Sequence, residues 1–281
     1  MRKDLSIKRI VVDADTWKYN ACHAANAKQE VPPPFSRAVL CLNNFVKGQF
    51  KFLEGALGKK INIREWIEKD KLATYLTSND NSNFRFKAAT IQGYKANRKD
   101  AVKPPHLEAI YDWLQRKWRS EVVYGMEADD KLGIEAAKDP EHTLIWHEDK
   151  DIWQCYGWHG WYDAKRAVTR RLELVEYPGT VRIERSPSGA LELFTTGEYR
   201  LQYQMIVGDN SDNIPKIIKE VKSGREYGYG DLEIYEMMAG LSAKEAEQLV
   251  LDLYEKHYGE EAEARYKEVY SLVKILDKEP S

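Results

Sequence analysis

Short apolar runs alternate with longer amphipathic segments in the first half of the chain. The runs are Arg9–Val12, Leu72–Thr77, Glu121–Tyr124 and Thr143–Trp146. The longer segments are Ser36 to about Leu57, Pro105–Trp118 and Glu127–Ala137. The runs predict strands and the longer segments predict helices. Alternation of this kind predicts an α/β fold with a mostly parallel central sheet flanked by helices.

The pattern changes in the middle of the chain. Residues 168–195 contain two runs of alternating character, Val181–Arg185 and Ala190–Thr195, on either side of a Ser-Pro-Ser-Gly sequence. Short alternating runs separated by turn residues predict a β-hairpin, here as an insertion into the α/β unit.

The C-terminal part has a helical pattern from about residue 231 onward. Ser242 and Glu245 form a capping box at the start of an amphipathic stretch. We therefore expect an α/β core over residues 1–205 and a helical region over residues 206–281.

Acidic residues follow the predicted strands or open the predicted helices. Nine of them stand in five clusters: Asp13; Asp80; Glu127, Asp129 and Asp130; Asp149 and Asp151; and Asp209 and Asp212. The carboxyl ends of strands in an open α/β sheet line one crevice, so these clusters are expected to meet there. Crowded carboxylates raise one another's pKa, and divalent metal removes this conflict. Oxygen ligands suit magnesium or manganese, which predicts metal-dependent phosphoryl transfer.

Single clusters also have structural interpretations. Asp13 alone could cap a helix, and Asp80 alone could be a turn residue. The acids at the start of the third predicted helix could complement the helix dipole. Glu127 and Asp130, however, are three residues apart and would share one face of a helix.

The later clusters have spacings that also place both carboxylates together. Asp149 and Asp151 would point the same way in an extended chain. Asp209 and Asp212 would lie on one helical face. All five clusters occupy the same kind of position relative to strands or helices, which favours one shared site.

These segments, in this order, resemble the 5′-nuclease superfamily of flap endonucleases and bacteriophage 5′→3′ exonucleases. The family pattern has two single Asp residues, then Glu-x-Asp-Asp, Asp-x-Asp and Gly-Asp-x-x-Asp-Asn. All are found here, ending with Gly208-Asp209-Asn210-Ser211-Asp212-Asn213. Tyr94-Lys95-Ala96-Asn97-Arg98 is similar to the family's Tyr-Lys-x-x-Arg. The resemblance spans residues 10 to about 235.

The resemblance implies a PIN-like nuclease core, a helical arch at about residues 84–104 and a C-terminal helix-hairpin-helix region that grips duplex DNA. It implies a metal-dependent 5′→3′ exonuclease or structure-specific flap endonuclease that hydrolyses DNA phosphodiester bonds. The implied setting is phage DNA replication, repair or primer removal. Gly228 and Gly230 match the hairpin, which in relatives can bind a potassium ion.

Two Mg²⁺ or Mn²⁺ ions are expected to act together. Residues expected around the first ion are Asp80, Glu127, Asp129 and Asp149. Asp151, Asp209 and Asp212 are expected around the second, with Asp13 and Asp130 in support. The resemblance assigns Lys95 and Arg98 to the scissile phosphate.

Basic and aromatic residues alternate in the predicted arch. Those expected to contact DNA are Arg85, Lys87, Tyr94, Lys99 and Lys103. Cations meet phosphates and rings stack on bases in single-strand binding sites. A solvated, lysine-rich loop is the simpler interpretation of such a run when it stands alone.

Two other functions are compatible with parts of the sequence. Val-Val-Asp13-Ala-Asp15-Thr16 loosely matches the start of haloacid-dehalogenase-type phosphatases, with Asp13 as nucleophile and Asp15 as acid/base partner. That match leaves the other clusters unexplained. A DNA-binding protein that has lost catalysis is the third possibility, and the complete carboxylate set disfavours it.

His147 departs from the pattern of the 5′-nuclease superfamily, whose members usually carry Ser or Thr two residues before the first Asp of the Asp-x-Asp motif.

The composition restricts how the chain could contact DNA and in which compartment it is expected. The net charge of −2 over 281 residues is not that of a strongly basic nucleic-acid binder, so DNA contacts must rest on local patches. Cys22, Cys41 and Cys155 form no CxxC pair, which favours a reducing compartment. Without a signal-peptide pattern or an apolar run of membrane length, a cytoplasmic monomer acting on DNA, or on an RNA–DNA hybrid, is expected.

Overall fold

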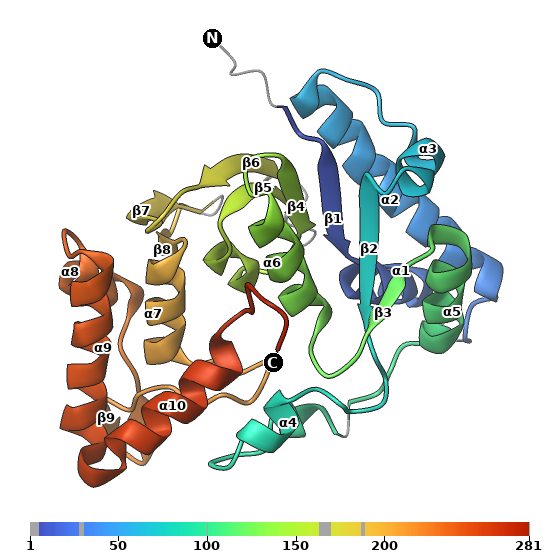
Figure 1. The fold of residues 1–281 in the computed structure, drawn as a ribbon. Coiled ribbons are helices and arrows are strands. Elements are labelled where there is room, and N and C mark those ends of the chain that lie inside the picture. Colours follow the sequence, from blue (N-terminus) through green and yellow to red (C-terminus); the bar gives the residue numbers. More distant parts are fainter. Residues whose placement is uncertain (1–5, 28–30, 100, 163–169, 187–188, 281) are drawn as a thin grey trace.

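A six-stranded sheet forms the centre of the computed structural model, which describes all residues except 1–5, 28–30, 100, 163–169, 187–188 and 281 (Figure 1). The strands are β1 (Arg9–Asp13), β2 (Leu72–Thr77), β3 (Glu121–Val123), β4 (Thr143–His147), β5 (Gly157–Tyr162) and β6 (Arg170–Val175). Their order is β3-β2-β1-β4-β5-β6. Neighbouring strands from β3 to β5 are parallel and β6 is antiparallel to β5. The predicted α/β class with a mostly parallel sheet is confirmed.

Helices cover both faces of this sheet. Helices α1 (Ala14–Asn26), α2 (Phe35–Leu57) and α5 (Leu107–Trp118) share one hydrophobic core with Ile10 and Val12. Helix α6 (Ala128–Lys138) packs on the opposite face with Val11. Successive side chains of a strand point to opposite faces, so the apolar run of β1 supplies both cores. The short helix α3 (Ile63–Glu68) precedes β2.

The predicted insertion is divided between two sheets. Strands β7 (Val181–Arg185) and β8 (Leu191–Thr195) pair with each other as an antiparallel hairpin. Strand β6, which begins within residues 168–195, instead extends the central sheet at β5. Only the second part of the predicted insertion is therefore a separate hairpin.

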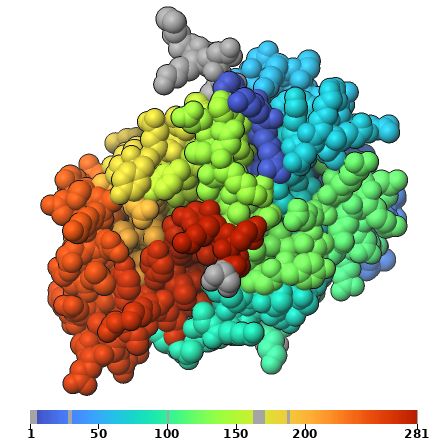
Figure 2. Space-filling view, viewed as in Figure 1, coloured from blue at the N-terminus to red at the C-terminus, as the bar shows by residue number. Residues whose placement is uncertain are grey.

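The C-terminal region is mainly helical. It contains α7 (Glu198–Val207), α8 (Asp231–Met238), α9 (Ala243–Tyr258), the 3₁₀ turn η3 (Gly259–Glu261) and α10 (Ala262–Val273). Helix α9 begins at the capping box formed by Ser242 and Glu245. The expected boundary at residue 205 falls inside α7. Figure 2 shows the C-terminal helices packed directly against the sheet half, and Ile275 joins the core beneath α6.

Two expected motifs differ from their predicted form. In place of a glycine hairpin between two helices, a two-stranded ribbon of β9 (Glu220–Lys222) and β10 (Arg225–Tyr227) precedes α8. In the predicted arch, the described residues form only α4 (Arg85–Ala88) and the turn η1 (Ala96–Arg98). No helix in the described part of the chain is long and apolar enough to cross a membrane.

Candidate functional site

The strand order reverses between β1 and β4. In open α/β sheets, a crevice forms at such a switch point, outside the carboxyl ends of the strands. Asp13 ends β1, and the chain leaves β4 directly before Glu148 and Asp149. The topology therefore brings the first and fourth predicted clusters to the same edge of the sheet.

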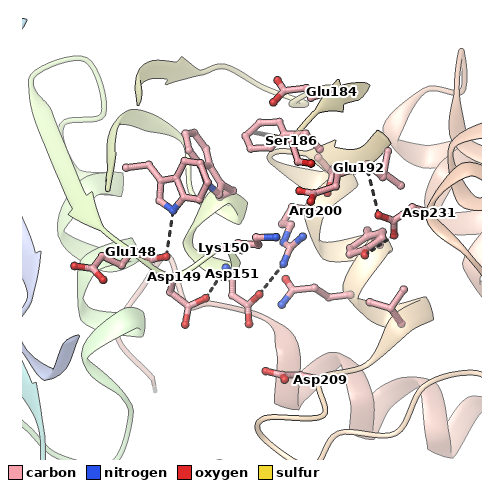
Figure 3. Close-up of a pocket in the computed structure, with 18 of the residues that line it drawn as sticks. Glu148, Asp149, Lys150, Asp151, Glu184, Ser186, Glu192, Arg200, Asp209 and Asp231 are labelled. Carbon is pink, nitrogen blue, oxygen red and sulfur yellow. Dashed lines mark hydrogen bonds and ion pairs between the residues drawn. The ribbon is translucent and has the colours of Figure 1, made fainter. Parts of the chain in front are cut away.

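Six carboxylates from three separate segments line a cavity of about 130 Å³ at this edge. They are Glu127, Asp129, Asp149, Asp151, Asp209 and Asp212. We call this space the carboxylate cavity. A larger cavity of about 700 Å³ shares the walls formed by Asp149, Asp151 and Asp209 and extends toward the β7–β8 hairpin (Figure 3).

The start of α6 positions the first two carboxylates. Glu127 is the N-cap of this helix and forms a reciprocal capping box with Asp130. Asp129 lies in the first turn, where negative charge interacts favourably with the helix dipole. The acidic motif thus both begins the helix and directs Glu127 and Asp129 into the cavity.

The turn after β4 positions the next pair. The Asp149 carboxylate accepts a hydrogen bond of 2.8 Å from the backbone N–H of Asp151, and the chain turns into the 3₁₀ helix η2 (Asp151–Gln154). The Asp151 carboxylate is paired with Arg200 of α7 at 2.8 Å. The segment is not extended as predicted, yet both carboxylates face the cavity.

A tight loop after α7 positions the last pair. Gly208 has φ of 61°, and a Cβ there would lie 2.5 Å from the carbonyl oxygen of Ile214. Asp209 and Ile214 exchange backbone hydrogen bonds across this loop. The expectation that Asp209 and Asp212 share a helical face is therefore wrong, because α7 ends at Val207. The loop closure brings both into the cavity instead.

Negative charge accumulates here. Asp149 is exposed as a whole residue, but removal of its carboxyl group from water, and then the charge of Asp151, raise its pKa to about 7. Burial and the neighbouring Asp15 raise the pKa of Asp13 to about 6. For Asp129, burial and then Asp13 and Asp149 hold the pKa well above its ordinary value. A bound cation would relieve this repulsion.

Side chains from the predicted arch meet these carboxylates. Lys95 contacts Glu127 and lies 3.6 Å from Asp212, and Arg98 pairs with Asp212. Burial would lower the pKa of Lys95, but the charges of Glu127 and Asp212 raise it above its usual value. The Tyr94 hydroxyl donates to Asp212 at 2.7 Å and lies 3.1 Å from Glu127. The ammonium and guanidinium groups thus act as counter-ions within the site.

The cavity suits a hard divalent cation by donor type and charge. The acidic side chains that line it offer carboxylate oxygens, which are the donors that magnesium and manganese prefer. Among the described residues, no three His, Cys, Asp or Glu side chains converge closely enough to hold a metal ion. Lys95, Arg98 and Arg200 occupy the carboxylates instead. Metal binding would therefore require Glu127, Asp151 and Asp212 to leave these ion pairs.

Asp130 and Arg85 differ from their predicted roles. The Asp130 side chain is fully buried and forms a two-pronged ion pair with Arg85, which is itself 4% exposed. Arg85 also donates to the backbone carbonyls of Leu272 and Lys274. In this structure the Asp130 carboxylate and the Arg85 guanidinium are thus engaged with each other and with backbone groups. The pair joins α6 to the C-terminal segment.

Two further predicted ligands lie apart from the carboxylate cavity. Asp80 is exposed and accepts a hydrogen bond from the backbone of Ser82 in its own turn. Asp13 is 8% exposed and caps α1 through Asp15, although its charge reaches Asp129 and Asp149.

The arrangement also disfavours the phosphatase alternative. One oxygen of Asp15 binds Lys18 at 2.7 Å, and the other accepts the backbone N–H of Thr77 at 2.9 Å. Asp13 accepts from Asp15 and Thr16. An acid/base residue and a nucleophile need access to substrate, and these two carboxyl groups are engaged in structural hydrogen bonds.

The residues predicted to contact DNA differ in their exposure. Lys87, Lys99 and Lys103 are exposed and remain predicted phosphate contacts. Tyr94 is 4% exposed, so its ring is not available to stack on a base. Gly230 is the N-cap of α8, and Gly228 lies just after the β9–β10 ribbon.

Sequence reasoning missed Arg200. It lies on α7, is largely buried, and pairs with Asp151 on the wall of the larger cavity. No motif or spacing marks this position, because its partner is forty-nine residues earlier in the chain. His147, in contrast, was marked by its departure from the family pattern. It is buried against His159, with ring nitrogens 3.0 Å apart.

No protein-family model matches the chain, and no curated protein sequence matches it. Among solved structures, the chain is similar to a mutant of the T5 5′-exonuclease, with 12% identity and a TM-score of 0.42 over 95% of this chain and 86% of the other. A likeness of this degree carries no conclusion about activity, which must rest on the geometry of the crevice.

Proposed function

We propose that this protein is a metal-dependent 5′-nuclease that hydrolyses phosphodiester bonds of DNA, in phage DNA replication, repair or primer removal. The observation that carries the proposal is the carboxylate cavity, where six acids from three segments meet beside Lys95 and Arg98. A purely structural cluster of acids would not be expected to stand at the switch point of the sheet, next to a cavity large enough for a ligand.

The carboxylates divide into two groups that could hold two ions. Glu127, Asp129 and Asp149 form one group. Asp151, Asp209 and Asp212 form the other. When bound, Mg²⁺ or Mn²⁺ would activate water and neutralise charge on the phosphate. The protein would then have to hold these carboxylates ionised and in place around the two ions.

Lys95 and Arg98 would change partners during the reaction. In the present structure they neutralise Glu127 and Asp212. Released from these carboxylates, the two cations could bind the scissile phosphate and would stabilise the charge that develops there. Tyr94 would act as a positioning residue, because its hydroxyl contacts both acids.

The experiment is digestion of 5′-labelled duplex and flap DNA, with product lengths measured in Mg²⁺ and in EDTA. We expect cleavage from or near the 5′ end that requires metal and is lost in Asp209→Asn. The same variant should still bind duplex DNA, since most contacts to the DNA phosphates are expected outside the carboxylate cavity. Cleavage that persists in EDTA, or in Asp209→Asn, would reject the proposed function.

A further inference from the structure

The carboxylate cavity is too small to hold a nucleotide. Its volume of about 130 Å³ equals that of about four water molecules in the liquid. This space suits ions or a phosphate group. A nucleoside attached to the scissile phosphate must therefore lie in adjoining space.

The larger cavity is the adjoining space on the side away from the predicted arch. It lies between the β4–η2 turn, the β7–β8 hairpin and α7, and shares Asp149, Asp151 and Asp209 with the carboxylate cavity (Figure 3). Its volume of about 700 Å³ falls in the range of small-molecule sites. The space is thus both continuous with the site and large enough for a nucleotide.

One wall of this cavity is built from flat groups. The Arg171 guanidinium lies 4.5 Å from the ring centre of Phe194 and 5.9 Å from that of Trp161. Guanidinium planes and aromatic rings both stack on bases. Two further lining residues have a buried polar atom without a hydrogen-bond partner among the described residues, namely Nε1 of Trp153 and Oγ1 of Thr195.

The cations of the cavity fall into two kinds. Arg171 is paired with Glu184, and Arg200 with Asp151. Lys150 and Arg185 also line the cavity, are exposed, and form no ion pair among the described residues. Within the part of the chain that the structure describes, the hydrogen bond of Arg185 goes to the backbone carbonyl of Gly189 at 3.1 Å. These two cations remain available to phosphate.

We propose that the cavity between the β7–β8 hairpin and α7 binds the 5′-terminal nucleotide of the strand being cut, with its phosphate groups held by Lys150 and Arg185. This inference rests on the proposed function and adds to it a preference for 5′-phosphorylated ends. The base would lie against the Arg171 guanidinium, which packs on the half-buried Phe194. The terminal nucleotide would then lie on the hairpin side of the carboxylates, opposite Lys95 and Arg98.

Two measurements on the full chain test this. The first is binding of thymidine 5′-monophosphate, followed by tryptophan fluorescence because Trp161 lines the cavity. The second is cleavage of duplexes that carry either a 5′-phosphate or a 5′-hydroxyl. We expect Arg185→Ala to weaken monophosphate binding about tenfold and to abolish the preference for 5′-phosphate, as loss of a charged hydrogen bond predicts. Lys150→Ala should weaken binding in the same way.

The matched control is Arg64→Ala, which removes an exposed arginine that pairs with Glu68 on α3. It should change neither measurement. Equal monophosphate binding by wild type and Arg185→Ala would overturn the inference. So would a 5′-phosphate preference that is lost in Arg98→Ala but kept in Arg185→Ala, because the terminal phosphate would then lie at the predicted arch.

Failure of the inference and failure of the proposed function give different results. Metal-dependent cleavage by wild type without monophosphate binding or 5′-phosphate preference would overturn the pocket and leave the nuclease standing. Arg185-dependent binding of the monophosphate by a protein that cleaves no DNA would support the pocket and reject the nuclease.

Discussion

Two ion-pair clusters connect the segment around residues 85–98 to the Glu127–Asp130 motif, and they differ in burial. Arg85 and Asp130 are 4% and 0% exposed, and their remaining polar atoms bind backbone groups of the C-terminal segment. Lys95 is 22% exposed, and it shares Glu127 and Asp212 with Tyr94 and Arg98 at the wall of a cavity. One cluster is closed and the other opens onto space for a ligand.

Because the two clusters differ in burial, one acidic motif can serve two purposes. A buried, fully paired charge cannot exchange partners without a large desolvation cost. A half-buried lysine on a long side chain can exchange a carboxylate for a phosphate. Adjacent residues of the motif therefore hold the two halves of the molecule together and prepare the site.

Removing the closed pair should have the largest effect on stability. Arg85→Ala leaves Asp130 buried without its partner, which typically costs about 3–5 kcal/mol in free energy of unfolding. Arg98→Ala, which removes an exposed partner of Asp212, should cost about 0–1 kcal/mol. Urea denaturation measures both. Similar losses for the two variants would contradict the division into a closed and an open cluster.

The open cluster should affect rate more than stability. Lys95→Ala is expected to lower the single-turnover cleavage rate by about 10²–10³, because it removes a charge directed at the transition state. Duplex affinity should change little. A variant that cleaves at the wild-type rate once saturated with DNA would show that Lys95 has no part in the chemical step.

The same residue should oppose metal binding when DNA is absent. Lys95 contacts Glu127 and lies near Asp212, so Lys95→Ala should bind Mn²⁺ more tightly, on the order of tenfold. Calorimetric titration of Mn²⁺ gives the affinity, and Lys87→Ala is the control because Lys87 is exposed and outside the cavity. Weaker Mn²⁺ binding by Lys95→Ala would argue against competition between lysine and metal.

Crowded acids should destabilise the metal-free protein at high pH. Because the pKa of Asp149 is raised to about 7, the folded state holds more protons than the unfolded state between about pH 4 and 7. Stability in EDTA should therefore fall as pH rises through this window. Asp149→Asn should raise the melting temperature at pH 8 but hardly at pH 4. An unchanged melting temperature of Asp149→Asn at pH 8 would contradict the raised pKa of Asp149.

The smallest effect is expected for an exposed cation. Lys99→Ala should weaken duplex binding and lower the slope of log affinity against log salt by about 0.9, as loss of one phosphate contact predicts. Its cleavage rate at saturation should match the wild type. A fall in rate as large as that of Lys95→Ala would extend the reactive cluster to Lys99.

Local patterns predicted the fold well and the site in part. The apolar run of β1 and the acids at the start of α6 determine local structure directly, so this strand and this helix followed from the sequence pattern. Three outcomes depended on the tertiary fold. Arg85 lies in a basic run but is buried by the C-terminal segment, Asp209 and Asp212 lie in a loop closed through Gly208, and Arg200 meets Asp151 only when α7 packs on η2.

The most direct test titrates Mn²⁺ into protein dialysed against EDTA. Bound ions are counted by electron paramagnetic resonance, and the same samples are assayed for cleavage of 5′-labelled duplex. We expect two bound ions per chain, cleavage that rises with occupancy, and loss of both in Asp149→Asn but not in Arg64→Ala. Cleavage without bound metal, or no bound Mn²⁺ in the wild type, would contradict it.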